Sequence, residues 1–215
     1  MVGNQLEALR ATPQVSRMGA PMKIVISIML AVCALLNCPS YAAPALAAYL
    51  PSATTRDGLK DFDFLIGTWS THYKRLRHPL SNNHEWYGCG GSAIVRTLWD
   101  GNANIEDGDV RCPGDIIRGM TLRIYDPKSH QWSLYWGTEK RGLNTAPQVG
   151  HFDDNGVGEF FADDTYAGRP IIVRYQWKSL SGDHPHFEQA FSADKGVTWE
   201  TNWICDYTRA AKADL

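Results

Sequence analysis

The residues best suited to chemistry are charged side chains within otherwise aromatic segments. The segments MTLRIYD and PIIVRYQW contain Arg123 and Arg174, and HPHFEQAF contains Glu188. Side chains alternate between the two faces of a β-strand, so Arg123 shares a face with Tyr125. Buried charges must be paired, and paired charges inside a pocket can bind a carboxylate or transfer protons. The sequence leaves open whether these polar faces or the aromatic faces opposite them point inward.

Two functions would use these residues differently. In a binding protein they would anchor a small, largely apolar ligand, and the ligand-binding set would be Trp69, Tyr73, Arg123, Tyr125, Trp136, Arg174 and Trp203. In a cofactor-independent isomerase, cyclase or lyase, Glu188 or His151 would be the general acid or base, and Arg174 would stabilise developing negative charge. A third hypothesis, a stabilising module with a filled core, predicts no cavity. The sequence does not decide whether the protein is an enzyme.

Other motifs indicate little further chemistry. His184 and His186 have H-x-H spacing, which can bind one metal ion from a strand. His184 follows a turn signal, however, and histidines in such a place more often face solvent, so we expect no metal site. The chain has no G-x-S-x-G nucleophile motif and no Walker-type or dinucleotide-binding glycine pattern. We expect no cofactor.

The elements that must position these residues are short strands. From Asp61 onward, aromatic and β-branched runs alternate with turn signals, and no long helical period appears, which is typical of an antiparallel all-β fold. Ten strands are predicted, near residues 64–76, 84–99, 102–112, 117–125, 131–138, 147–153, 157–163, 170–178, 185–192 and 198–208. Because closure removes exposed edges, we predict a single antiparallel up-and-down β-barrel of about ten strands. Barrels of this size can hold one small ligand.

A turn signal at Asp100-Gly101 predicts a disulfide. A hairpin turning there pairs residue i with residue 201 − i, which places Cys89 directly opposite Cys112. Cysteines in such positions lie within bridging distance, although a bulge in so long a ladder would break the register. Cys205 is then predicted to be a small buried apolar residue.

The first 60 residues differ from the rest. Lys23 and the 13-residue apolar run Ile24 to Leu36 precede small-x-small sites, the pattern of a secretory signal peptide. We assign residues 1–42 as a leader (1–21 fit a misassigned start, 22–42 the signal peptide), 43–60 as a linker, 61–209 as the barrel and 210–215 as a tail. The apolar run is too short to span a membrane. We therefore predict a periplasmic or secreted protein, with no membrane insertion of the mature chain.

The charge of the mature chain bears on its partners. Removing residues 1–42 leaves 18 basic and 22 acidic residues in about 173, a net charge of −4. This balance gives no argument for binding nucleic acid or an anionic membrane. We expect a small-molecule ligand or substrate as the partner, and the oligomeric state stays open.

The segment DFDFLIGTW carries a family resemblance. It resembles the first strand of calycins, the superfamily of lipocalins, fatty-acid-binding proteins and nitrobindins, whose G-x-W motif corresponds to Gly67-Thr68-Trp69. The resemblance implies that this tryptophan closes one barrel end and that Arg209, in CDYTR, packs on it. Residues 62–209 are also similar to bacterial lipocalin-like domains of unknown function, in which LWDG, YDPKSHQW and FSADKGVTWE occur in the same order. The fold that this implies hosts both binding proteins and enzymes.

The segment SADKGVTW resembles the Asp-box of sialidases and other propeller proteins. A propeller repeats the motif once per blade of about 40–50 residues, and the chain has one clean copy. We interpret it instead as a hairpin turn in which Asp194 accepts backbone hydrogen bonds and Gly196 takes a positive φ. A three-residue turn at 194–196 would pair Phe187 with Trp203 and Phe191 with Trp199.

Overall fold

The computed structural model describes residues 54–178 and 183–210. The predicted leader, most of the predicted linker and the tail beyond Ala210 lie outside these residues. The strands are β1 (Gly67–Leu76), β2 (Trp86–Leu98), β3 (Ala103–Cys112), β4 (Asp115–Asp126), β5 (Gln131–Thr138), β6 (Gly142–Leu143), β7 (Gln148–Phe152), β8 (Gly158–Tyr166), β9 (Arg169–Lys178), β10 (His186–Ser192) and β11 (Glu200–Arg209). The described residues also include two short 3₁₀ helices, η2 (Asp63–Leu65) and η3 (Trp99–Gly101).

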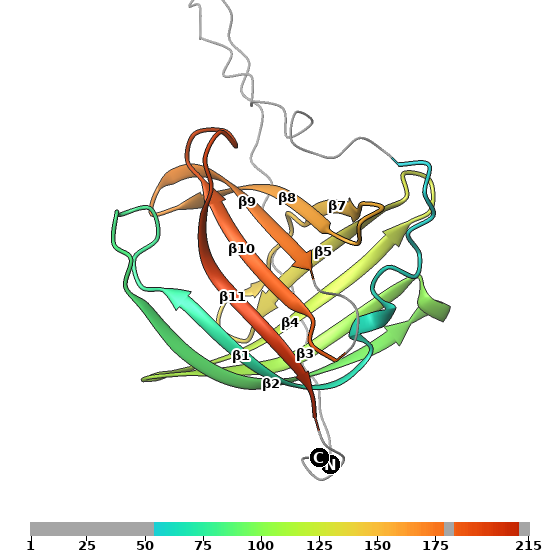
Figure 1. The fold of residues 1–215 in the computed structure, drawn as a ribbon, viewed down its shortest axis with the longest axis horizontal. Helices are drawn as coiled ribbons and strands as arrows, with labels where there is room; N and C mark the ends of the chain where they lie inside the picture. Colours follow the sequence, from blue (N-terminus) through green and yellow to red (C-terminus); the bar gives the residue numbers. More distant parts are fainter. Residues whose placement is uncertain (1–53, 179–182, 211–215) are drawn as a thin grey trace, which may run out of the picture. The chain divides into compact units, whose positions relative to one another are not determined.

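The strands form one closed antiparallel barrel (Figure 1). Strands β1 to β5 pair in succession, β5 pairs with β7, β7 to β11 pair in succession, and β11 pairs with β1, so the sheet closes on itself. The two-residue strand β6 pairs only with β5 and is additional to the ten barrel strands. The predicted all-β up-and-down barrel of about ten strands is confirmed.

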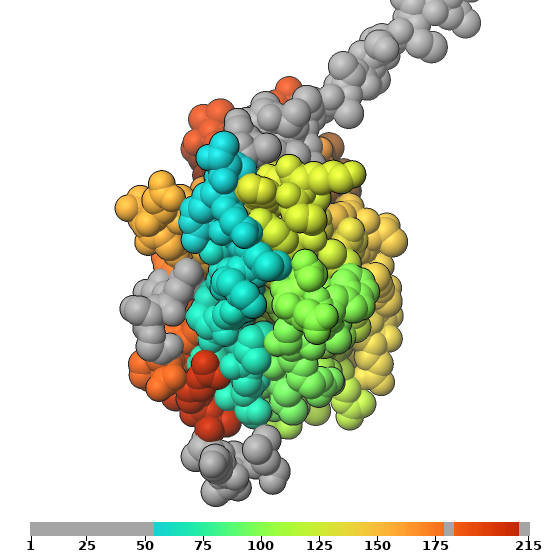
Figure 2. Space-filling view, turned by 90° about the vertical axis from the view of Figure 1, so that its right-hand side faces the viewer, coloured from blue at the N-terminus to red at the C-terminus, as the bar shows by residue number. Residues whose placement is uncertain are grey.

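Alternating burial along the strands divides the barrel into an inner and an outer face. In β1, Trp69, Thr71 and Tyr73 are buried, while the residues between them are exposed. This is the period-2 pattern that a half-buried strand requires. In the space-filling view, the N-terminal described segment and β1, in blue-green, lie between the orange-red C-terminal strands and green β2 (Figure 2).

The segment just before β1 fills one end of the barrel with aromatic rings. Phe62 is 1% exposed, and its ring centroid lies 5.0 Å from that of Phe152 and 5.1 Å from that of Trp132. The Trp132 indole also donates a hydrogen bond to the Gly58 carbonyl at 2.9 Å. Edge-to-face aromatic contacts of this kind stabilise a core beyond their area burial alone. This end of the barrel is therefore packed.

Arg209 clamps the same end. Its guanidinium lies 3.9 Å from the centroid of the Trp69 ring, as the calycin resemblance implied, and donates hydrogen bonds to the carbonyls of Ile66 at 2.6 Å and Phe64 at 3.2 Å. Gly67 has φ 132°, and a Cβ atom there would collide with the Arg209 guanidinium. The glycine and the tryptophan of the G-x-W motif thus both accommodate Arg209.

The β2–β3 hairpin has the predicted register. Leu98 pairs with Ala103 and Gly90 with Arg111, and the ladder keeps this register to its end. Cys89 and Cys112 form a disulfide with their Cα atoms 4.4 Å apart. Cys205 is a free cysteine with no exposed surface, as predicted.

The predicted register of the last hairpin is wrong. Phe187 pairs with Cys205 instead of Trp203. The connection is longer than three residues, because β10 ends at Ser192 and β11 begins at Glu200. A register shift after Gln189 offsets the ladder once more.

The turn within that connection nevertheless has the predicted chemistry. The Asp194 carboxylate accepts hydrogen bonds from the Thr198 backbone N–H at 2.9 Å, the Thr198 hydroxyl at 2.6 Å and the Ser192 hydroxyl at 2.8 Å. Gly196 has φ 83°. Asp194 therefore holds the turn, although the turn does not set the strand pairing that we predicted, since Phe191 pairs with Glu200 instead of Trp199.

Within residues 54–178 and 183–210, no helix has the length and apolarity needed to cross a bilayer.

The disulfide generates a prediction about stability. Replacing both Cys89 and Cys112 with serine should lower the free energy of unfolding by about 3 kcal/mol, because the bridge closes a loop with a sequence separation of 23 residues. Urea denaturation with and without reductant measures this. Reductant should destabilise the wild-type protein by a similar amount and leave the double variant unchanged; a wild type insensitive to reductant would contradict the prediction.

The Asp194 turn predicts a pH dependence. Hydrogen bonds from the Thr198 hydroxyl and backbone lower the pKa of Asp194 from 3.8 to about 2. A carboxyl whose pKa is lowered on folding contributes stability above its unfolded pKa and loses it as the pH falls through the folded pKa. The melting temperature of Asp194→Asn should therefore lie below that of the wild type by a constant amount above about pH 4. This difference in melting temperature should shrink toward pH 2.

Asp163→Asn is the matched control, because Asp163 is exposed on β8. A difference between wild type and Asp194→Asn that does not change between pH 4 and pH 2 would contradict the assignment.

Candidate functional site

A cavity lies inside the barrel, beside the packed aromatic end. Its volume is about 60 Å³. Its walls are mainly aromatic and aliphatic, with a polar group on one side. The lining residues are Tyr73, Glu106, Val110, Thr121, Arg123, Leu134, Trp136, Tyr175, Trp177, Phe187, Gln189, Trp203, Cys205 and Tyr207. Phe62, Trp132 and Phe152 are not among them, so the cavity is separate from the packed aromatic end.

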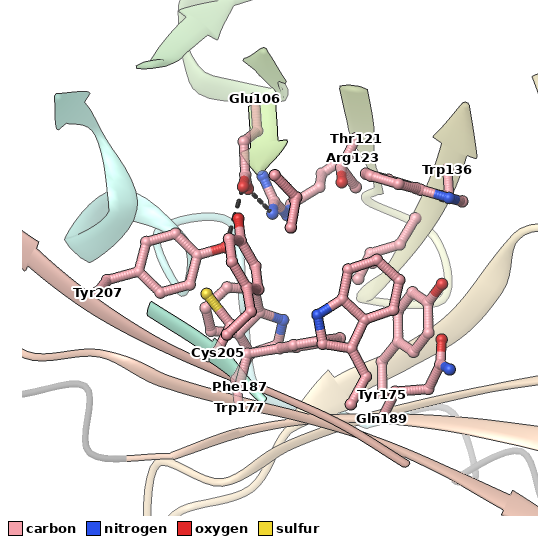
Figure 3. A pocket seen from close by; sticks show the side chains of 14 residues that line it. Glu106, Thr121, Arg123, Trp136, Tyr175, Trp177, Phe187, Gln189, Cys205 and Tyr207 are labelled. Carbon is pink, nitrogen blue, oxygen red and sulfur yellow. Dashed lines mark hydrogen bonds and ion pairs between the residues drawn. The ribbon is translucent and has the colours of Figure 1, made fainter. Parts of the chain in front are cut away.

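The polar side of the cavity is a buried ion pair. Arg123, 1% exposed, forms a salt bridge through Nη2 with the Glu106 carboxylate and donates a hydrogen bond from Nη1 to the Asn104 amide oxygen at 3.0 Å. The Tyr207 hydroxyl donates to the other Glu106 carboxylate oxygen at 2.9 Å. Figure 3 shows the Glu106 carboxylate directed toward both partners. Both oxygens of Glu106 therefore accept a hydrogen bond within the barrel.

Strand pairing brings these residues together. Asn104 pairs with Arg123, and Glu106 pairs with Thr121, across the β3–β4 ladder. Because side chains alternate along each strand, all four point to the same face, which is the interior. The Arg123 guanidinium also lies 5.1 Å from the Phe62 ring centroid and 5.5 Å from that of Trp177. Cation–π contacts of this kind help a guanidinium remain buried.

Burial keeps the other titratable groups of the cavity neutral. It raises the pKa of Tyr207 well above its ordinary value, and the Glu106 carboxylate raises it further. The pKa of Cys205 is raised in the same way, by burial first and then by Glu106. Burial likewise raises the pKa of Tyr73. The tyrosines are therefore hydrogen-bonding groups, and Cys205 is a thiol and not a nucleophilic thiolate.

Three hydrogen-bond donors of cavity-lining residues have no partner among the described residues. They are Nε of Arg123 and Nε1 of Trp177 and Trp203. Buried polar groups in proteins are nearly always hydrogen-bonded. All three are donors, so an acceptor would be needed to satisfy them.

The structure separates the predicted ligand-binding residues into three groups, of which the third is Arg174 alone. Tyr73, Arg123, Trp136 and Trp203 line the cavity. Trp69 and Tyr125 are buried outside its lining: Trp69 lies under Arg209, and the Tyr125 hydroxyl bonds to Asp57 at 2.8 Å.

Arg174 does not line the cavity. Its guanidinium lies 4.8 Å from the centroid of the Trp199 ring and 3.6 Å from the Glu159 carboxylate. The neighbouring Tyr175 lines the cavity, so Arg174 points to the outer face. For β9, the aromatic face is therefore the inner one, whereas the Arg123 face of β4 points inward.

Glu188 and His151, the predicted acid–base residues, do not line the cavity either. Phe187 and Gln189 line it, so Glu188 between them lies on the outer face. Burial acts to raise the pKa of Glu188, but hydrogen bonds from Lys178 at 2.9 Å and His186 at 3.0 Å outweigh it and lower the pKa.

His151 alternates along β7 with the buried Gly150 and Phe152, and its Nδ1 lies 3.1 Å from the Phe152 carbonyl oxygen. Within the described ranges, no group of three His, Cys, Asp or Glu side chains comes together in a way that could hold a metal ion.

Sequence reasoning missed Glu106, Asn104 and Tyr207. The signal was present in NANIEDGDV, where Asn104 and Glu106 alternate with Ile105. Once Arg123 is placed inside, a buried carboxylate must accompany it. The partner is set by the β3–β4 register, which runs across the turn after Cys112 and which we did not predict.

Comparisons with known proteins support the fold. No protein-family model matches the chain, and no curated protein matches it. Among solved structures, it is similar to the S-type phycobiliprotein lyase from Guillardia theta, with a TM-score of 0.51 and 10% sequence identity, over 74% of this chain and 95% of the lyase chain. Such low identity speaks for the fold alone. The chain thus has a calycin-like fold.

The ion pair generates a prediction. Glu106→Gln leaves the Arg123 charge buried without its counter-charge and should lower the free energy of unfolding by about 3–5 kcal/mol. The double variant Glu106→Leu/Arg123→Met removes both charges and should recover most of that loss. Tyr207→Phe, which removes one neutral donor, is the control and should cost about 1 kcal/mol. Urea denaturation measures all three, and a double variant no more stable than Glu106→Gln would refute the assignment.

Proposed function

We propose that this protein is an exported β-barrel that binds a small, largely apolar molecule. The observation that carries the proposal is the cavity, in which aromatic walls surround one polar side formed by Arg123, Glu106 and Tyr207. Binding sites for small molecules are typically apolar pockets with a few placed polar groups. Tyr73, Trp136 and Trp203 form apolar walls, and the unpartnered donors of the lining anchor the ligand through an acceptor oxygen.

The size of the cavity limits what it holds without rearrangement. A single water molecule needs about 10–15 Å³ of such space, so about 60 Å³ suits a few water molecules or a small part of a ligand. A larger ligand must extend out of the cavity at the end bounded by Trp136 and Trp203, or displace side chains at that end. One side chain there is Trp136, whose indole packs closely over Gly119, where a Cβ atom would collide with it.

An enzymatic function is the second candidate. A carboxylate inside a cavity, beside an arginine and a tyrosine hydroxyl, favours a cofactor-independent isomerase, cyclase or lyase in which Glu106 is the acid–base group. Both Glu106 oxygens already accept hydrogen bonds from Arg123 and Tyr207, so a substrate would have to displace one of these partners to reach the carboxylate. The binding function is therefore the better supported of the two.

Export and family membership are also proposals. The Cys89–Cys112 disulfide is compatible with an oxidising compartment such as the periplasm or the cell exterior, where disulfides persist. The ordered motifs LWDG, YDPKSHQW and FSADKGVTWE support kinship with bacterial lipocalin-like domains.

Native mass spectrometry of the protein purified from its own host tests the binding function. We expect a retained small molecule in the wild type and its loss in Val110→Phe, which places a ring in the cavity and costs about 1–3 kcal/mol through overpacking. Val197→Phe is the matched control, because Val197 is 80% exposed, and it should retain the molecule. Absence of any retained mass, or equal retention by both variants, would count against the proposal.

A further inference from the structure

A second concave surface lies at the mouth of the barrel and adjoins the cavity. Trp136 and Trp203 line both, and their ring centroids lie 6.1 Å apart in an edge-to-face arrangement. The two indoles are therefore the boundary between the interior and the mouth. A ligand longer than the cavity would pass between them.

The mouth carries more positive than negative charge. Its charged residues are Arg75, Arg118, Lys140, Arg141, Asp115 and Asp164. Lys140 is paired with Asp115 at 2.5 Å, and Arg118 with Glu139 at 3.3 Å. Across the described part of the chain, neither Arg75 nor Arg141 forms a salt bridge within 4.0 Å of a carboxylate, although Arg75 is near enough to Asp115 to help lower the pKa of that carboxyl. Two cations are thus available to a ligand, and Asp164 disfavours a second negative charge on it.

Among the cations of the mouth, Arg75 contacts a ring that lines the cavity. It shares the inward face of β1 with Tyr73 and pairs across the sheet with Trp203. Its guanidinium lies 4.3 Å from the centroid of the Trp203 ring, the same ring that lines the cavity. Arg75 therefore holds a positive charge directly at the entrance.

The interior has the opposite preference. The Arg123 charge is already neutralised by Glu106, and both Glu106 oxygens are occupied. An anionic group placed beside Arg123 would lie next to a buried carboxylate of the same sign, and like charges at short distance in a low-dielectric interior repel strongly. An anion inside the cavity is disfavoured, whereas one at the mouth meets unpaired cations.

We propose that the ligand is an amphipathic monoanion that enters apolar end first, with its anionic group held at the mouth by Arg75 and Arg141. This inference rests on the proposed binding function and adds the charge and orientation of the ligand. A carboxylate, a sulfonate or a phosphate diester would supply this single negative charge, whereas a phosphate monoester carries nearly two at neutral pH.

A matched pair of fluorescent probes tests it on the full chain. 1-Anilinonaphthalene-8-sulfonate and N-phenyl-1-naphthylamine have the same rings and differ by one sulfonate. We expect the sulfonate probe to bind more tightly at low salt and to lose affinity as salt rises, since exposed charges are screened. The double variant Arg75→Gln/Arg141→Gln should weaken the sulfonate probe about tenfold, which equals about 1.4 kcal/mol, and should change the affinity of the neutral probe less than twofold.

Lys74→Gln is the control for charge loss. Lys74 is next to Arg75 in the sequence, but its side chain lies on the exposed outer face of β1, whereas that of Arg75 lies on the inward face. It should leave both affinities unchanged. Equal effects of Lys74→Gln and the double variant, or a neutral probe that binds as tightly as the anionic one, would overturn the orientation proposed here. A sulfonate probe that gains affinity in Glu106→Gln would also overturn it, since the anion would then lie inside. Binding of neither probe to the wild type would instead refute the binding function itself.

Discussion

The Arg123–Glu106 ion pair is the interaction on which the character of the interior depends. A guanidinium inside a barrel of aromatic side chains requires a counter-charge, because an unpaired buried charge costs several kcal/mol. Glu106 supplies it from the adjacent strand, and Tyr207 and Asn104 complete the hydrogen bonds. The pair therefore fixes a polar side in an otherwise apolar cavity while leaving that side electrically neutral.

The interior of the barrel has a packed end and an end that contains the cavity. At one end, Phe62 and the rings around it are packed, and Arg209 ties the preceding segment to Trp69 and to backbone carbonyls. Beyond Arg123 the side chains leave a cavity, which is bounded by Trp136 and Trp203. The packed end contributes apolar burial, and this allows the other end to be left incompletely filled. The predicted filled core and the predicted cavity thus occupy different ends of the same barrel.

Strand-level features followed from the sequence because they depend on local patterns. Alternation of aromatic and polar residues located the strands, and a two-residue turn signal set the β2–β3 register that places Cys89 opposite Cys112. The predicted register of the last hairpin, β10–β11, was wrong because it too was inferred from a local turn signal alone. Its turn signal at Asp194 is real, but the connection includes further residues and a register shift follows Gln189. A one-residue slip changes every cross-strand partner, and a single turn motif does not encode it.

The sequence by itself determined the class of fold and the register that places Cys89 opposite Cys112, since these depend on alternation and on one turn. The burial of Cys205 followed once the other two cysteines were paired, and the Arg209–Trp69 contact was implied by the resemblance to calycins. The tertiary structure decided which face of each strand is the inner one. Alternation separates the two faces of a strand without saying which one meets the core, and closure of the barrel makes that choice for all strands together. It placed Arg123 inside, where Glu106 neutralises it, and Arg174 and Glu188 outside. The candidate site is therefore a property of strands β3, β4 and β11 brought together by closure, and no single segment specifies it.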